Sequence, residues 1–215
     1  MPLSSHDIAA IRTDYRLAAL DETSAGSDPF AFFSKWFEEA RTAAIDEVNA
    51  MTLATCDQEG KPHARIVLLK GLEEEGFVFF TNYESVKGQN LKQNPHAALV
   101  FFWKELERQV RVEGIVEKCS GKISDDYFHS RPEGSRLGAW ASPQSKIIES
   151  REILDKNYER YQSEFSETIP RPPHWGGYVL QPQHIEFWQG RSSRMHDRIV
   201  FEKNGAAWKR FRLAP

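Results

Sequence analysis

The sequence predicts a mainly β fold with peripheral helices (α+β), in which antiparallel strands form a barrel or a sandwich. Several short runs rich in β-branched and aromatic residues follow one another at the spacing of hairpins. Near the end of the chain, Asn204-Gly205 separates two further runs and is a strong type I′ hairpin signal. Segments with helical periodicity lie before, between and after the strands, so we expect helices packed around one barrel.

The composition excludes several classes of protein. The chain has 215 residues, of which 40% are hydrophobic and 27% charged, with a formal net charge of −3. Its longest apolar run, residues 97–103, is much shorter than the roughly 20 residues that cross a membrane. The first ten residues lack the basic and apolar regions of a signal peptide. We therefore expect no membrane and no nucleic-acid partner.

Cysteine usage points to a reducing compartment. Cys56 and Cys119 are too few for a disulfide framework. The sequence has no C-x-x-C motif and no Cys/His cluster, so we expect no metal site. Both thiols are interpreted as structural, which predicts a cytoplasmic protein.

Two helices are expected before the strands. Residues 5–20 are interpreted as a short polar helix, followed by a loop at residues 21–27. Asp28-Pro29 then predicts a helix start, because aspartate caps and proline fits the first turn. An apolar stripe at a spacing of three to four residues follows, formed by Phe30, Phe33, Phe37, Ala40 and Ala44.

The middle of the chain changes to the period of strands. Turns at 57–60 and 73–76 and a short helix at 86–92 separate five expected strands, which are residues 51–56, 63–70, 77–81, 97–103 and 108–118.

The last third begins with helices and ends with strands. Ser120 predicts a helix cap, and Pro132 a stop after residue 130. A long helix starts near residue 150, carrying Leu154, Tyr158, Tyr161 and Phe165. After the stiff connector 170–173, strands are expected at residues 178–188, 196–202 and 208–213.

Basic residues gather at strand ends and loops, where they are suited to phosphate groups. Bidentate arginines, lysines and serine hydroxyls are the usual phosphate-binding groups. The residues concerned are Arg65, Lys70, Lys87, Arg131, Arg136, Arg194 and Arg198. Arg65 and Lys70 are five apart, so in a regular strand they face opposite ways and serve different groups. Tyr127 and Arg131 share a helix face, with Ser135 one loop beyond. We expect a phosphorylated small ligand.

His196 is the histidine best placed for chemistry. It lies two residues from Arg194 at the start of an expected strand, so both project to one face. Such a histidine exchanges a proton or donates to a phenolic oxygen. Trp188 lies at a strand end, where it can flank a planar cofactor. Dinucleotide, P-loop and G-x-S-x-G hydrolase motifs are absent from the sequence.

Motifs along nearly the whole chain, from Arg12 to Pro215, closely resemble those of the pyridoxine/pyridoxamine 5′-phosphate oxidase family. They are RIVLLK (65–70), FTN (80–82), ERQV (107–110), YFHSRP (127–132), GAW (138–140), QS (144–145), FWQG (187–190), RMHDR (194–198) and RLAP (212–215). Each piece is weak alone, but this order at this spacing is highly specific.

The resemblance implies an FMN-binding split β-barrel of antiparallel Greek-key type that works as a homodimer. Two FMN sites would lie at the subunit interface, each built from both chains. The reaction implied is oxidation of pyridoxamine 5′-phosphate or pyridoxine 5′-phosphate to pyridoxal 5′-phosphate, with O₂ as acceptor and H₂O₂ as product. Residues 1–27 would form a helix and a flexible lid segment, and residues 28–215 a single domain.

The resemblance also assigns residues. The FMN set is Arg65, Ile66, Val67, Leu68, Leu69, Lys70, Phe80, Thr81, Lys87, Gln109, Gln144, Ser145, Trp188 and Arg198. The substrate set is Lys70, Tyr127, Arg131 and Ser135 on the phosphate, Arg194 and His196 as catalytic residues over the ring, and Arg12 and Tyr15 in the lid. One departure stands out, because Val86-Lys87 replaces the family's usual Arg-Lys pair.

Two alternatives remain open from the sequence. The first is a split-barrel flavin reductase that uses NAD(P)H, against which the R-x-H-D-R and Y-F-H-S-R-P segments argue. The second is a non-catalytic carrier of flavin or pyridoxal phosphate, to which the Val86 departure lends weight.

Overall fold

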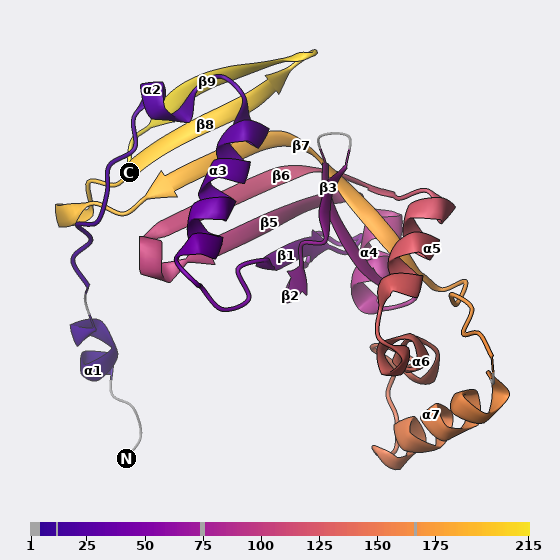
Figure 1. The fold of residues 1–215 in the computed structure, drawn as a ribbon. Coiled ribbons are helices and arrows are strands. Elements are labelled where there is room, and N and C mark those ends of the chain that lie inside the picture. Colours follow the sequence, from indigo (N-terminus) through magenta and orange to yellow (C-terminus); the bar gives the residue numbers. More distant parts are fainter. Residues whose placement is uncertain (1–4, 12, 74–75, 166) are drawn as a thin grey trace. The chain divides into compact units, whose positions relative to one another are not determined.

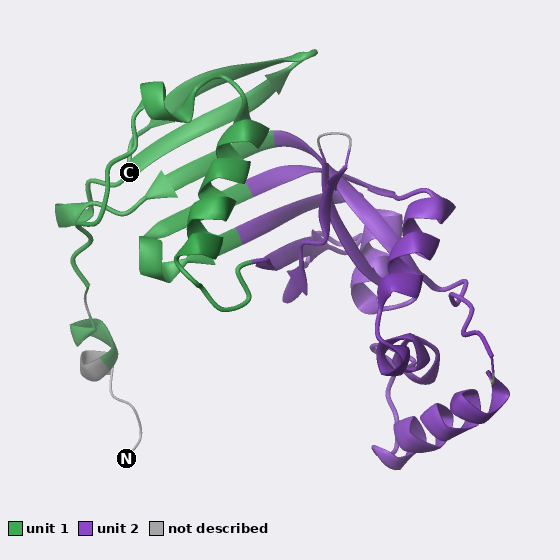
Figure 2. Cartoon of the chain, in the orientation of Figure 1, with its two compact units in different colours: residues 1–48, 101–111, 184–215 green, residues 49–100, 112–183 purple. Residues whose placement is uncertain are grey.

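A computed structural model of the chain describes residues 5–11, 13–73, 76–165 and 167–215. The chain divides into two units (Figure 2). Unit 1 comprises residues 1–48, 101–111 and 184–215, and unit 2 comprises residues 49–100 and 112–183. The predicted division into residues 1–27 and 28–215 stays a prediction.

The strands form one mainly antiparallel sheet (Figure 1). They are β1 (Ala50–Cys56), β2 (Pro62–Leu68), β3 (Gly71–Glu73), β4 (Gly76–Asn82), β5 (His96–Trp103), β6 (Arg108–Lys118), β7 (Trp175–Gln189), β8 (Asp197–Asn204) and β9 (Ala207–Leu213). They pair in the order β2-β1-β5-β6-β7-β4-β3, and β8 pairs with β7 and β9. The pairs β1–β2, β1–β5, β3–β4, β4–β7, β7–β8 and β8–β9 are antiparallel.

Helices accompany the strands, which confirms the predicted fold class. The α-helices are α1 (Ser5–Ala10), α2 (Glu22–Ala25), α3 (Pro29–Thr42), α4 (Val86–Gln93), α5 (Gly121–Ser130), α6 (Glu133–Ala141) and α7 (Glu152–Glu164), and the 3₁₀ turns are η1 (Lys104–Leu106) and η2 (Ser192–Arg194). In the described part of the chain, no helix combines the length and apolarity needed to cross a bilayer. The same residues contain no group of metal-ligating side chains.

In unit 1, α3 crosses the strands of that unit (Figure 1), and its aromatic side chains pack against them. The side chain of Asp28 accepts hydrogen bonds from the Phe30 and Ala31 N–H groups, which caps the helix as predicted. The Phe33 ring lies 5.1 Å from that of Phe101 on β5, and Trp36 lies 5.3 Å from Phe187 on β7.

The predicted stripe on α3 is confirmed in part, because Phe33 and Ala40 are buried. Phe32 and Trp36 are buried although they were not in the stripe, and Phe37 is only partly buried. Ala44 is exposed and lies beyond the helix at φ 53°. The helix ends at Thr42. Its buried face includes residues 32, 36 and 40, whose four-residue spacing is close to the 3.6-residue repeat of a helix.

Three further expectations for unit 1 are wrong. The helix expected over residues 5–20 ends at Ala10, and the loop expected at 21–27 contains α2, which Asp21 caps with a capping box. The last hairpin places Gly205-Ala206, rather than Asn204-Gly205, in its two-residue loop, because Asn204 pairs with Ala207. Of these two loop residues, Gly205 has a positive φ of 63° and Ala206 does not, as a type II′ turn requires of its first and second central residues.

Unit 2 agrees with most expected elements. β1, β4, β6, α4 and α5 lie within a residue or two of the predicted ranges, and Ser120 caps α5 as predicted. β2 ends at Leu68, so Lys70 lies outside that strand. The turn expected at 73–76 includes residues outside the described part of the chain.

The second correction in unit 2 concerns Pro132. It was interpreted only as a stop, but it is the residue before α6, and a loop was expected where α6 forms. Proline has no N–H to lose at a helix start, so one residue both ends α5 and begins α6. The α5–α7 region surrounds a small core of Phe128, Leu137, Ile169 and Trp175.

Candidate active site

Unit 2 contains a pocket of about 470 Å³ that gathers most of the residues predicted for cofactor and phosphate binding. Those that line it are Ile66, Val67, Leu68, Lys70, Phe80, Thr81, Lys87, Tyr127, Arg131, Ser135 and Gln144. They come from β2, β4, α4, α5, α6 and the segments that follow these elements. The structure thus brings together positions that are up to 78 residues apart, from Ile66 to Gln144.

One part of this pocket is a set of phosphate-type donors. Tyr127 lies in the last turn of α5, Arg131 follows that helix directly, and Ser135 lies in the first turn of α6. Because the chain turns at Pro132, these three donors line the same pocket. Lys70 joins them from the end of β2, with its Nζ 6.0 Å from the centre of the Tyr127 ring.

Arg131 packs against an aromatic ring. Its guanidinium lies 4.6 Å from the centre of the Trp175 ring, and burial lowers its pKa. Within the described residues, its buried Nη1 has no hydrogen-bond partner. A buried donor without a partner is costly, so this atom fits a ligand oxygen.

Aromatic rings form one wall of the same pocket. The Phe80 ring stacks on Tyr127 at 3.9 Å and 18°, and on Trp175 at 5.5 Å and 12°. Such a wall of near-parallel rings suits a planar, partly apolar ligand.

A second cationic group lies where α4 begins. Lys87 Nζ donates to Thr81 Oγ1 at 3.1 Å, Ser85 Oγ at 3.2 Å and Gln144 Oε1 at 2.9 Å. Burial, and then the charge of Arg65, lowers the pKa of Lys87 to about 8. The Ser85 side chain also caps the helix by accepting from the Gly88 N–H. A cation destabilised by burial beside a helix N-terminus is a fitting place for an anion.

Arg65 reaches this region from β2 and is anchored to β1. Its Nη1 donates to the Leu53 carbonyl at 3.0 Å and to Thr55 Oγ1 at 2.8 Å. Thr55 Oγ1 also accepts from Asn90 Nδ2 at 3.2 Å. No ion pair joins Arg65 or Lys87 to a carboxylate in the described part of the chain, so both charges are available to a ligand. Lys70 lines the unit 2 pocket and Arg65 is not among its lining residues; that the two serve different groups stays a prediction.

Unit 1 has its own pocket, of about 530 Å³, which contains the predicted ring-binding residues. It is lined by Ile11, Thr13, Asp14, Tyr15, Arg191, Ser193, Arg194 and His196. Trp188 stands behind it, with its ring 4.6 Å from His196 and 5.8 Å from Tyr15. Gly190 allows this packing, since a Cβ there would lie 2.7 Å from Tyr15 Cγ.

Arg198 is directed by a buried acid. It lies opposite Trp188 in the β7–β8 register, and it donates to Glu186 at 2.9 and 3.0 Å and to the Ala214 carbonyl. Burial raises the pKa of Glu186, but the Arg198 hydrogen bonds and the Arg111 charge outweigh it and hold that pKa below its usual value. Gln109 lies on β6 and is half-buried.

Some predicted residues differ from expectation. Arg194 lies in the 3₁₀ turn η2 rather than in a strand, so Arg194 and His196 share a pocket through a turn and not through strand alternation. Leu69 is buried, Ser145 has φ 69°, and neither lines the unit 2 pocket. Arg12 lies outside the described residues.

Sequence reasoning missed Trp175, Thr55 and Arg191. Trp175 lines the unit 2 pocket and Arg191 the unit 1 pocket, while Thr55 binds Arg65. An aromatic residue next to Gly176-Gly177 was a signal for Trp175, because paired glycines mark close approach in a strand. Nothing in the sequence pattern marks Thr55.

Together, the cationic donors and aromatic walls of these pockets suit phosphorylated, ring-shaped small molecules. Residues 37–165 match the family model described as pyridoxamine 5′-phosphate oxidase. Residues 175–215 match the model described as the pyridoxine 5′-phosphate oxidase C-terminal dimerisation region. The chain belongs to the pyridoxamine 5′-phosphate oxidase family.

Curated relatives agree with this membership. The chain is 56% identical to a pyridoxine/pyridoxamine 5′-phosphate oxidase of Paraburkholderia phymatum, over 97% of this chain and 99% of the relative. It is 57% identical to a protein of the same name from Burkholderia mallei, with the same coverage.

Two solved structures show the same fold. PhzG from Burkholderia lata, in complex with tetrahydrophenazine-1-carboxylic acid, superposes with a TM-score of 0.86 at 27% identity, over 93% of this chain and 99% of that one. A pyridoxamine 5′-phosphate oxidase-related, FMN-binding protein of Nostoc punctiforme has a TM-score of 0.70 at 18% identity, over 88% of this chain and all of that one.

Proposed function

We propose that this chain oxidises pyridoxamine 5′-phosphate and pyridoxine 5′-phosphate to pyridoxal 5′-phosphate with O₂. The alcohol gives pyridoxal 5′-phosphate and H₂O₂, and the amine, which also consumes water, gives ammonia as well. Membership of an oxidoreductase family supports this reaction. The observation that carries it is the buried Nη1 of Arg131, which has no hydrogen-bond partner among the described residues. Arg131 lines the same pocket as Lys70, Tyr127 and Ser135.

FMN is the cofactor, and the residues present fit it. Arg65 and Lys87, which pair with no carboxylate among the described residues, would supply two cations for its phosphate. The segment 66–70 with Phe80, Thr81, Gln144 and Ser145 would hold the rest of the molecule, joined by Gln109, Trp188 and Arg198. When bound, FMN supplies the two-electron acceptor of the reaction and passes the electrons to O₂.

This chain's own residues hold and orient the substrate. Lys70, Tyr127, Arg131 and Ser135 bind its phosphate, which fixes the ring before chemistry and removes part of the entropic cost. Arg194 and His196 cover and hydrogen-bond the ring, and Tyr15 lies in the same pocket. The match to a dimerisation region supports a homodimer, and we assign each FMN site to residues of both protomers. The cytoplasmic location stays a prediction.

The deciding experiment is an aerobic assay of the purified protein with FMN and pyridoxamine 5′-phosphate, in which pyridoxal 5′-phosphate and H₂O₂ are followed together. We expect both to appear in equal amounts. In the same assay we expect Arg131→Ala to raise KM for pyridoxamine 5′-phosphate. Lys122→Ala, which removes an exposed positive charge from α5, is the matched control. Bound flavin without either product overturns the proposal and favours a carrier.

Two further substrates separate the competing functions. Oxidation of NAD(P)H without a vitamer would support a flavin reductase instead. A reduced phenazine carboxylic acid is the second comparison, because the PhzG structure contains such a compound. Faster turnover of that acid than of either phosphorylated vitamer would contradict the substrate assignment.

A further inference from the structure

The loop from β7 to β8 holds two predicted site residues in an unfavourable backbone conformation. Ser193 and Arg194 have φ values of 56° and 60°, and neither is glycine. Consecutive left-handed residues of this kind cost energy and persist only where the surroundings enforce them. Inside the loop, a single backbone hydrogen bond, from the Met195 N–H to the Ser192 carbonyl at 3.1 Å, closes the turn.

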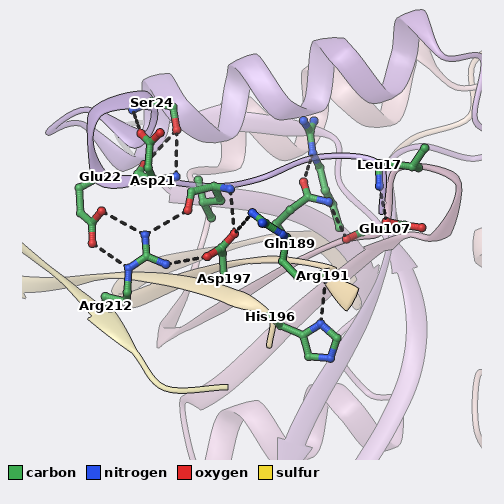
Figure 3. Close-up of polar contacts among 12 residues, drawn as sticks. Leu17, Asp21, Glu22, Ser24, Glu107, Gln189, Arg191, His196, Asp197 and Arg212 are labelled. Atoms are coloured by element: carbon green, nitrogen blue, oxygen red, sulfur yellow. Dashed lines mark hydrogen bonds and ion pairs between the residues drawn. The ribbon is translucent and has the colours of Figure 1, made fainter. Parts of the chain in front are cut away.

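A side-chain ion pair connects the two ends of this loop. Arg191 Nη1 donates to Asp197 Oδ2 at 3.0 Å (Figure 3). Arg191 comes directly after Gly190 at the end of β7, and Asp197 is the first residue of β8. The pair therefore spans the strained residues and holds the loop at a fixed width.

The Asp197 carboxylate is itself held in place by further donors. Its Oδ2 also accepts from the Leu20 N–H at 3.1 Å, and its Oδ1 accepts from Arg212 Nη1 at 2.8 Å. Arg212 is oriented in turn by Glu22, at 2.9 and 3.1 Å (Figure 3). With both oxygens engaged, the carboxylate cannot rotate freely, so the position of Arg191 is set as well.

The same loop determines how His196 carries its proton. The Arg191 N–H donates to His196 Nδ1 at 3.1 Å (Figure 3). A backbone N–H can only donate, so Nδ1 is the acceptor and the neutral ring carries its hydrogen on Nε2. The other contacts of the ring are to Trp188 and Tyr15, at 4.6 and 6.0 Å between centroids. Nε2–H therefore has no hydrogen-bond partner among the described residues, in a side chain that lines the unit 1 pocket.

We propose that the Arg191–Asp197 ion pair is a clamp that closes this loop and fixes His196 as the Nε2–H tautomer. His196 then acts on the substrate as a hydrogen-bond donor to an oxygen, such as the phenolic oxygen of the pyridine ring, and not as a proton acceptor. Arg191 and Asp197 are positioning residues. The role toward the substrate rests on the proposed function, whereas the tautomer is a property of the protein itself.

The tautomer is measured without any turnover. The FMN-loaded protein is labelled with [¹⁵N]histidine and studied by NMR at alkaline pH, where imidazole rings are neutral. Long-range ¹H–¹⁵N correlations distinguish the two tautomers, and the His196 signals are identified by their loss in His196→Gln. We expect a single Nε2–H form. A ring protonated on Nδ1, or an even mixture, overturns the proposal.

Variants of the clamp test the role of the ion pair. We expect Arg191→Ala and Asp197→Asn to convert the His196 signals to a mixture of tautomers. Arg41→Ala breaks an exposed ion pair with Glu38 on α3 and should leave them unchanged. If Asp197→Asn fails to fold, the milder Arg191→Gln replaces it. An unchanged single tautomer in the folded clamp variants overturns the clamp.

Two isosteric variants of His196 test the donor role with pyridoxamine 5′-phosphate. The glutamine amide nitrogen can take the place of Nε2, and the asparagine amide that of Nδ1. We expect His196→Gln to keep a kcat about tenfold higher than His196→Asn, the size of one hydrogen bond. The reverse order contradicts a donor at Nε2. If the wild type has no turnover, the proposed function fails while NMR still decides the tautomer.

Discussion

The guanidinium of Arg131 lies 4.6 Å from the centre of the Trp175 ring, inside the unit 2 pocket. An indole face attracts a cation and also shields it from water. An ion pair with a carboxylate would neutralise the charge of Arg131. Trp175 holds the guanidinium in place and leaves that charge intact. The charge stays available to a phosphate.

Replacing Trp175 with leucine should weaken substrate binding. A cation–π contact contributes about 0.5–2 kcal/mol, so we expect Trp175→Leu to raise KM for pyridoxamine 5′-phosphate by about 2- to 30-fold. Trp175→Phe keeps an aromatic face and should stay near the wild type. Steady-state kinetics measures both, and an unchanged KM in Trp175→Leu would show that the ring does not position Arg131.

FMN binding should weaken as pH rises above about 8. Burial and the Arg65 charge lower the pKa of Lys87 to about 8, so in the free protein the ammonium becomes neutral above that pH. A phosphate attracts the charged form only, which makes the FMN Kd increase with pH. Fluorescence titrations of FMN between about pH 7 and about pH 9.5 measure this rise in Kd. The rise extends from the lowered pKa of Lys87 toward the ordinary pKa of lysine.

Lys87→Met is the control for this pH dependence. It should bind FMN more weakly at neutral pH and lose the increase in Kd above pH 8. In the unfolded chain Lys87 keeps the ordinary lysine pKa of 10.5, so between about pH 8 and 10.5 the unfolded chain binds more protons than the folded protein. The free energy of unfolding of the unliganded wild type therefore rises with pH across this window. A Kd that rises equally in the variant would assign the effect to another group.

Val86→Arg should tighten FMN binding. Val86 is the first residue of α4, beside Lys87, and is 44% exposed, so an arginine can be accommodated there. One charge-assisted hydrogen bond contributes about 1.5–3 kcal/mol, which corresponds to a Kd lowered about 10- to 150-fold. Val86→Gln controls for size. Equal affinity for FMN in Val86→Arg and the wild type would mean that the phosphate does not reach this position.

The sequence predicts locally determined features better than contacts between distant residues. Asp28 and Ser120 were recognised as helix caps because a cap is decided within four residues. α6 was missed because Pro132 is compatible with both a helix end and a helix start.

The candidate site shows the same limit. Tyr127 and Arg131 are grouped by helical spacing, with Ser135 one loop beyond, and all three line one pocket. The contact of Arg131 with Trp175 joins residues 44 positions apart and depends on how β7 packs, so no local pattern indicates it. Likewise, the clamp from Arg191 to Asp197 depends on a turn with left-handed residues that are not glycine, which no sequence rule predicts.

Arg194→Ala and Arg131→Ala should separate catalysis from binding. Arg194 lines the unit 1 pocket near His196, and we expect its loss to lower kcat with little change in FMN affinity. Arg131 lies among the phosphate donors of the unit 2 pocket, so its loss should mainly raise KM. Kinetics with pyridoxamine 5′-phosphate measures both. An unchanged kcat in the first variant, or an unchanged KM in the second, contradicts the assignment.

Thr55 should support FMN binding although it touches Arg65 and not the ligand. Its buried Oγ1 accepts from Arg65 at 2.8 Å and from Asn90 at 3.2 Å. Thr55→Val keeps the shape but removes the acceptor, which leaves the Asn90 amide unpaired and Arg65 with the Leu53 carbonyl alone. We expect the FMN Kd to rise about 2- to 10-fold, and the free energy of unfolding to fall by about 1–3 kcal/mol.

Riboflavin separates a role in phosphate binding from a general loss of stability, because it has the ring of FMN without the phosphate. If Thr55 positions Arg65 for the phosphate, Thr55→Val weakens FMN binding and leaves riboflavin binding unchanged. Thr55→Ser, which restores the hydroxyl, should recover most of the FMN affinity. Equal weakening of both flavins, with no recovery in the serine variant, would show that Thr55 stabilises only the core around β1.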